Sequence, residues 1–256
     1  MITFVHSFQS EWLKKRRSAA FWLVILGGFF IPAIILISRL VQFDELAAAN
    51  ASNHIWEVLY QRSWQFMAIL LLPMGVILAT SLVTQLEFRN NGWKQLHTTP
   101  QRLTTVYFAK LLVILLMLLQ FFILFNAGVY LVGVIPSVFR GVPYPNEPFP
   151  WRTFLRGDGR WFVDCLPIVA LQYLISLQFR NFLVPIGAGL AIYVGSMMGM
   201  FWKYGYILPY AYCAVNFLHN NIKVDRTVDI QHWAIGYFVL FGIGSYILYI
   251  TKREKG

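Results

Sequence analysis

The sequence predicts an all-α integral membrane protein whose helices cross the bilayer several times. Of its 256 residues, 58% are hydrophobic and 12% are charged, which is about half the charged share of a soluble domain. Six apolar stretches approach or exceed the roughly 20 residues that one crossing needs. Basic residues outnumber acidic ones by 21 to 11 and are scattered between these stretches. That scatter is typical of loops facing anionic lipid, and it argues against a nucleic-acid-binding domain.

The predicted spans cover 18–40, 64–86, 105–135, 161–179, 182–202 and 232–251. The third is longer than one crossing needs, so it should tilt or protrude. The fourth is the most polar, because it contains Asp164, Pro167 and Gln172. We expect a single domain, residues 1–256, made of membrane helices.

Six spans place both chain ends on one side of the membrane, and local charge predicts the cytoplasm. Lys14 to Arg17 precede the first span, and Lys252, Arg253 and Lys255 follow the last. The loop 42–61 contains no Lys or Arg. Four Arg residues in the loop 136–160 oppose this orientation.

Residues 2–17 are predicted to form an amphipathic helix on the inner surface. At 100° per residue, Ile2, Val5, Leu13 and the aromatic residues Phe4, Phe8 and Trp12 fall on one half of the helix. The other half contains His6, Ser7, Ser10, Glu11, Lys14 and Arg17. Such a helix lies in the headgroup plane; the alternative is a plain extension of the first span. The apolar stretch is too long for a signal peptide, and no cleavage site follows it.

Two segments outside the spans have distinct compositions. The loop 136–160 holds five prolines between Pro136 and Pro150, so irregular backbone is expected throughout it. The segment 204–218 is apolar, too short to span and interrupted by Pro209. A re-entrant or interfacial piece on the outer side fits it best.

No pattern for catalysis or metal binding is present. The phosphate-binding motif GxxxxGK[ST], HExxH and GxSxG are all missing, so we expect no catalytic residue, no metal and no bound cofactor. The five histidines are far apart. The cysteines, Cys165 and Cys213, fit no metal spacing; two free thiols are favoured, although a bridge near the outer face stays open.

A few polar residues within the spans have two interpretations. Asp164 could relay protons, but a structural carboxylate is favoured. Asn126 and Gln120 could line a pathway or form hydrogen bonds between helices.

The fifth predicted span carries small residues at every fourth position. This stripe consists of Gly187, Ala191, Gly195 and Gly199. Small residues let a second helix backbone approach closely. The stripe could pack within the chain or form a contact between subunits.

The stretch after the second span, "EFRNNGWKQLHTTPQRLTTVYFAK", resembles the first cytoplasmic loop of ABC-2 exporter permeases of the bacteriocin and lantibiotic self-immunity type. The matching positions are Glu87, Asn91, Trp93, Lys94, Thr99, Pro100, Ala109 and Lys110. The N-terminal "FQSEWLKKRRSAAFWL" is similar to the family's opening, and "FWKYGYILPYAY" to its outer segment before the last span.

The resemblance implies a permease subunit in the bacterial inner membrane that pairs with a second permease, identical or paralogous. ATP and magnesium would bind separate ABC ATPase subunits. A coupling helix in 87–99 would contact the ATPase, with Glu87, Arg89, Asn91, Trp93, Lys94 and Pro100 as its site residues. The first and fifth spans would form the permease interface, and residues 2–17 a connecting helix.

Aromatic residues make up 17% of the chain, which favours a hydrophobic or amphipathic substrate such as a peptide or lipid-like molecule. Two other classes remain open. Paired charges inside the membrane or an internal repeat would favour a secondary transporter or channel. A polytopic enzyme would require clustered His, Asp or Glu.

Overall fold

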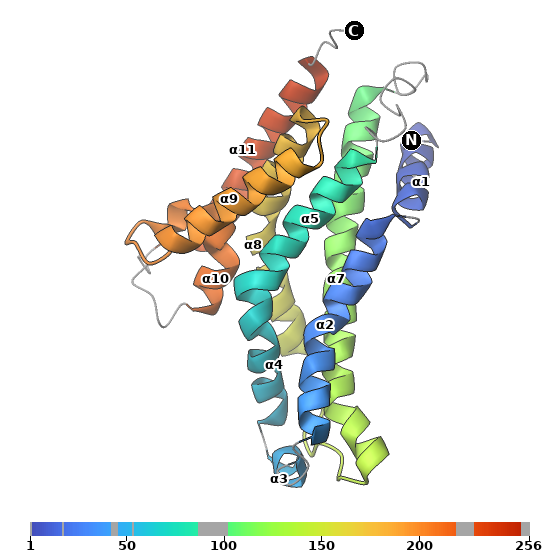
Figure 1. Ribbon diagram of the computed structural model, residues 1–256, viewed down its shortest axis with the longest axis vertical. Coiled ribbons are helices and arrows are strands. Elements are labelled where there is room, and N and C mark those ends of the chain that lie inside the picture. The colour runs from blue at the N-terminus through green and yellow to red at the C-terminus, as the bar shows by residue number, and fades with distance from the viewer. Residues whose placement is uncertain are drawn as a thin grey trace.

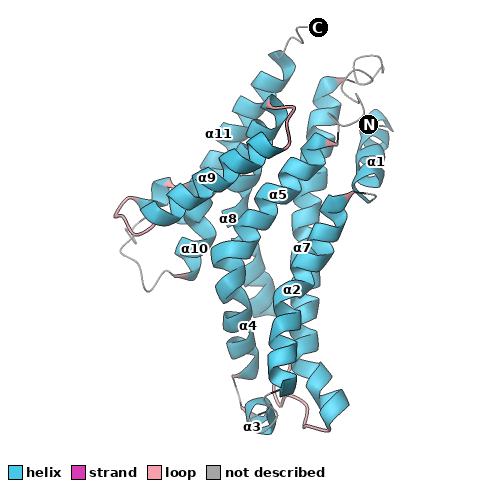
Figure 2. Ribbon diagram, in the orientation of Figure 1, coloured by secondary structure: helices cyan, strands magenta, loops and turns pink. Residues whose placement is uncertain are grey.

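The computed structural model describes residues 2–16, 18–41, 46–52, 54–86, 102–218 and 228–251. Within these ranges every regular element is a helix (Figures 1 and 2), which confirms the predicted all-α class. Five helices are long and apolar enough to cross a membrane. They are α2 (Ala19–Val41), the continuous helix Ile55–Gln85, α7 (Leu103–Arg140), α8 (Trp151–Gln178) and α11 (Ile230–Thr251).

The remaining predicted span, 182–202, is only partly helical. Its helix, α9 (Leu183–Gly199), has 17 residues, fewer than the roughly 20 that a full crossing needs. The chain then passes through η3 (Gly205–Ile207), η4 (Pro209–Ala211) and α10 (Tyr212–Phe217). Even so, α1 and the end of α11 lie toward the same end of the molecule (Figure 1).

The predicted boundaries of the irregular loop 136–160 are both wrong, because each end of this range is helical. Helix α7 continues through Pro136 to Arg140, and Gly141, with φ of 66°, ends it. Glycine adopts this left-handed conformation without a steric penalty. Helix α8 begins at Trp151, so only 141–150 is a loop. Proline is tolerated inside a membrane helix where neighbouring groups satisfy the freed carbonyl. The sequence of this segment does not reveal whether such groups are nearby.

The second predicted span starts earlier than expected and contains a change of helix type. It consists of α4 (Ile55–Phe66), a π-helical turn η1 (Met67–Leu71) and α5 (Leu72–Gln85). A π turn places one extra residue in the helix and is frequent at functional sites. The small helix α3 (Leu46–Ala51) precedes it.

Two packed layers organise the bundle. Helix α8 lies against α5 and α11, and α2 lies along α7, with α1 (Ile2–Arg16) beside the start of α7 (Figure 1). Helices α2 and α7 approach closely at two glycines. A Cβ atom on Gly28 would lie 3.0 Å from Leu124 Cβ, and one on Gly128 would lie 2.8 Å from Pro32 Cγ. Close approach of this kind holds membrane helices together by van der Waals contact.

Candidate functional site

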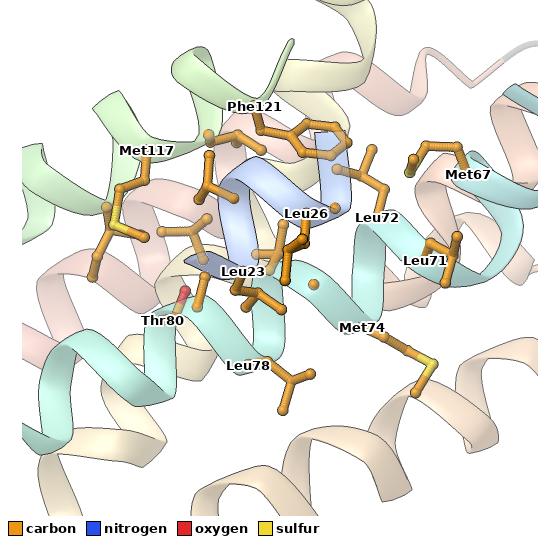
Figure 3. A pocket seen from close by; sticks show the side chains of 18 of the residues that line it. Leu23, Leu26, Met67, Leu71, Leu72, Met74, Leu78, Thr80, Met117 and Phe121 are labelled. Atoms are coloured by element: carbon orange, nitrogen blue, oxygen red, sulfur yellow. The ribbon is translucent and has the colours of Figure 1, made fainter. Parts of the chain in front are cut away.

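An apolar cavity of about 330 Å³ that could hold a ligand lies between α2, α5 and α7. Leu23, Leu26 and Phe30 of α2 form one wall, and Met117 and Phe121 of α7 form another. Residues of η1 and α5, from Met67 to Thr80, line most of the rest (Figure 3), and Val169 of α8 completes it. Leu26 and Phe30 are 64% and 53% exposed, so this wall lies at the surface of the bundle.

A polar cluster joins α5, α8, α9 and η4 on the other side of α5. The Gln172 side-chain amide donates to Ser81 Oγ and to the Pro185 carbonyl, both at 2.8 Å. The Tyr210 hydroxyl donates to Gln172 Oε1 at 3.2 Å. Gly189 packs directly against this amide, and any Cβ there would overlap Gln172 and Ile77. The cluster is fully buried and fixes the short segment after α9 to the core.

Helix α1 contacts α7 through charged and polar side chains. The Glu11 carboxylate lies 2.5 Å from Lys14 Nζ and 3.8 Å from Lys110 Nζ. Lys15 Nζ donates to Gln120 Oε1 at 2.7 Å and lies 4.1 Å from the Trp12 ring centre. Charges are buried in protein only where they are paired or hydrogen-bonded, and this contact meets that condition.

The surroundings of Glu11 and Lys15 shift the pKa of each side chain. Burial would raise the pKa of Glu11, but the ammonium groups of Lys110 and Lys14 outweigh it and the pKa is lowered from 4.5. Burial lowers the pKa of Lys15. The structure also corrects the predicted orientation of α1. Ser7 and Glu11 were expected to face water, but both are buried. Val5 and Leu13 are exposed, and Phe8 and Trp12 are partly buried.

Comparison with known proteins decides the family. The model of the ABC-2 family transporter proteins matches residues 7–199, which extend from α1 to the last residue of α9. The chain belongs to the ABC-2 transporter family. A search of the curated proteins and a search of the solved structures each find no match.

Family membership identifies the chain as a multi-pass membrane component of an ABC transporter. Such ABC-2 components generally work with ABC ATPases. The matched region begins within α1 and ends with α9, whereas α10 and α11 follow it.

The predicted coupling residues of this ABC-2 chain lie outside the described residues. This applies to Glu87, Arg89, Asn91, Trp93, Lys94 and Pro100, and Arg17 of the N-terminal helix is outside them as well. The described neighbours of the loop are the end of α5 and the start of α7. The coupling assignment therefore remains a prediction.

The small-residue stripe lies mainly on the surface of the ABC-2 bundle. Gly187, Ala191 and Gly195 are exposed, and a Cβ at either glycine would meet no atom within 4 Å. Gly199 instead contacts Leu208 of the same chain. Three of the four positions are thus available to a partner, and the role of the stripe between subunits remains a prediction.

The buried polar groups of α8 include two carboxylates. Asp164 is buried and accepts a 2.7 Å hydrogen bond from the Asn216 amide. Asp158 accepts one from Asn126. Sequence reasoning missed Asp158 because it placed this residue in the loop 136–160. The partners on α10 and α7 support the structural interpretation of Asp164 and the cross-helix interpretation of Asn126.

The two cysteines are brought together by the fold. Cys165 of α8 and Cys213 of α10 are buried free thiols with their sulfur atoms 3.6 Å apart. Within the described residues, no three His, Cys, Asp or Glu side chains are placed to hold a metal ion.

Proposed function

We propose that this chain is the permease subunit of an ATP-driven exporter for hydrophobic or amphipathic substrates, either peptides or lipid-like molecules. The match to the ABC-2 family over residues 7–199 carries the proposal. The apolar cavity between α2, α5 and α7 supports the substrate class. The self-immunity type of exporter, to which the loop 87–110 is similar, is our proposal for the subfamily.

The proposed mechanism divides the work between chains. A separate ABC ATPase binds ATP with magnesium, and its closure moves the loop 87–99. The α1–α7 contact through Glu11 and Lys110 connects the surface helix to the long helix that follows this loop. The permease then contributes different contacts in its inward-open and outward-open states, which is the only way that a binding event can shift such an equilibrium.

The surroundings of the permease complete the proposal. Two permease chains, identical or paralogous, pair in the bacterial inner membrane with both ends in the cytoplasm. The exposed stripe at Gly187, Ala191 and Gly195 supplies a surface that allows close helix approach. Lipid covers the remaining apolar surface. A secondary transporter without an ATPase is the alternative, and the family match counts against it.

Co-purification from native membranes tests the ATPase partner. We expect an ATPase chain with a phosphate-binding loop to accompany the permease. Trp93→Ala and Lys94→Glu should each release that chain while the thermal unfolding of the permease stays unchanged. A control change at the exposed Gly236 of α11, to Leu, should retain the ATPase. Retention by both loop variants would overturn the coupling assignment.

Cross-linking tests the permease pair. Gly195→Leu introduces a side chain where the structure shows open space, so the subunit should fold and the dimer should weaken. Gly236→Leu adds the same side chain at another open position, on α11, and should leave the dimer intact. An unchanged dimer in Gly195→Leu would remove the stripe from the interface.

A further inference from the structure

We infer that the cavity between α2, α5 and α7 binds one hydrocarbon chain of a lipid or lipid-tailed amphiphile, with the polar linkage of that molecule beside Thr80. The inference rests on the proposed function, because it specifies where the apolar part of a transported substrate contacts the permease. A membrane lipid would present the same chemistry to the same residues.

The lining of the cavity excludes water as its occupant. Its walls consist of Leu, Ile, Val, Phe, Met, Ala and Gly, and Thr80 is the one residue with a polar side chain among those that the structure places there. A buried water needs two to four polar partners, and apolar cavities of this kind stay dry. In a bilayer the surrounding medium is hydrocarbon, so a cavity with an apolar wall at the lipid surface is filled by hydrocarbon.

The size of the cavity fits one chain. An apolar protein cavity of roughly 150 Å³ takes up benzene, a molecule of six carbons. The cavity here, about 330 Å³, is therefore large enough for roughly twelve carbons. Its volume is smaller than that of one helical turn, which is about 10–12 Å across with side chains and 5.4 Å long, so a second copy of the chain could cover the mouth but could not fill the interior.

Flexible side chains surround the cavity. Met67, Met74 and Met117 contribute thioether groups from η1, α5 and α7 (Figure 3). Methionine has three rotatable bonds and adapts to irregular apolar partners. Gly27 and Gly75 add no side chain at the wall, and a Cβ at Gly75 would meet no atom within 4 Å. These residues leave a space that can accommodate chains of different shape.

Thr80 determines which end of the cavity the polar linkage of the bound molecule occupies. Its side chain is fully buried, and Oγ1 has no hydrogen-bond partner among the described residues. A buried unpaired hydroxyl is costly, and an ester or amide carbonyl of the ligand would satisfy it. Thr80 lies five residues before Gln85, the end of α5, which is about 8 Å along a helix. This depth suits the linkage between a headgroup and its chain.

Photo-cross-linking tests the site. The purified full chain is placed in phosphatidylcholine nanodiscs with a trace of phosphatidylcholine that carries a diazirine in one acyl chain, and labelled residues are mapped by mass spectrometry. We expect labels on the cavity methionines. Gly75→Leu should abolish these labels by filling the space, whereas the matched Gly236→Leu should keep them. Equal labelling of the cavity in Gly75→Leu would overturn the proposal.

A second variant tests the direction of the ligand. Thr80→Val keeps the volume and removes the hydroxyl, so cavity labelling by the ester-linked probe should fall. Labelling by a diazirine alkane without an ester should not change. If both probes respond alike, Thr80 does not contact the linkage.

The source of the chain is then resolved in the complex with its ATPase. Loss of the label during ATP turnover assigns the site to substrate, and retention assigns it to a resident lipid. Both results support a hydrocarbon site. Labelling in nanodiscs needs no ATPase, so failure of co-purification would refute the proposed function and leave this inference standing.

Discussion

Helices α8 and α2 are both long enough to cross the membrane, but they use their side chains in opposite ways. The most apolar 18-residue stretch of α2 has a mean hydropathy of 2.6, and 28% of that stretch is buried. The corresponding stretch of α8 has a mean hydropathy of 1.4, and 61% of it is buried. The more polar helix is thus the more internal one. Lipid tolerates only apolar side chains, whereas protein neighbours can supply hydrogen bonds. Between these two helices, the one with more polar side chains has more of its surface covered by protein.

The largest expected difference comes from removing the same atoms on the two helices. Ile168 of α8 is fully buried, and Ile37 of α2 is 62% exposed. Ile168→Ala should cost about 2–5 kcal/mol of unfolding free energy through the cavity that it leaves. Ile37→Ala should stay within about 0.5 kcal/mol. Unfolding in mixed detergent measures both, and equal losses would break the comparison.

Overpacking against α8 should have the next largest effect. Gly189→Leu forces a side chain into Gln172 and Ile77, and should cost about 1–3 kcal/mol. Gly236→Leu adds the same side chain in open space on α11 and serves as the control. The comparison fails if the unfolding midpoints of the two variants coincide.

Removing a polar partner of α8 should cost somewhat less. Asn216→Leu takes away the hydrogen bond to Asp164, and should cost about 1–2 kcal/mol, because a buried polar group then lacks its partner. Replacing Asp164 by Leu as well should restore part of the loss. If the double variant is less stable than the single one, the two side chains are not coupled as described.

The smallest effect is expected at α1, where the buried group that depends on its partners is a charged carboxylate. The pKa of Glu11 is lowered from 4.5, so its contribution to stability is complete above that value and disappears as pH falls through the lowered pKa. The thermal midpoint of the wild type should drop across this window more than that of Glu11→Gln. Identical pH profiles would show that the carboxylate does not hold α1 to α7.

The lipid-facing parts of the fold were predictable, and the internal ones were not. Long apolar runs such as α2 and α7 can be recognised in the sequence, because side chains that face lipid must be hydrophobic. Helix α8 was placed ten residues too short, since Arg152, Arg156, Asp158 and Arg160 looked like a loop. A hydrophobicity pattern cannot distinguish a polar loop from a helix whose partners satisfy its polar groups.

The candidate site was less predictable than the fold. Glycines at regular spacing were identified in α9, but Gly189, the glycine that the core needs, lies off that stripe. Thr80 has no unusual neighbours in sequence, and its significance comes from a cavity formed by three separate helices. The contact of Glu11 with Lys110 joins residues about a hundred positions apart, which no local pattern reveals.

The π turn η1 sets the phase between the two ends of one long helix. One row of buried positions along it advances in steps of four residues, except for a single step of five, from Met67 to Leu72, across this turn. The series is Leu59, Ser63, Met67, Leu72, Val76, Thr80 and Thr84. Deleting one residue here would rotate α5 by about 100° relative to α4, turning Thr80 away from the cavity while leaving composition and length almost unchanged. The turn therefore works as a one-residue spacer, and the alignment of the cavity wall depends on the number of residues in the turn.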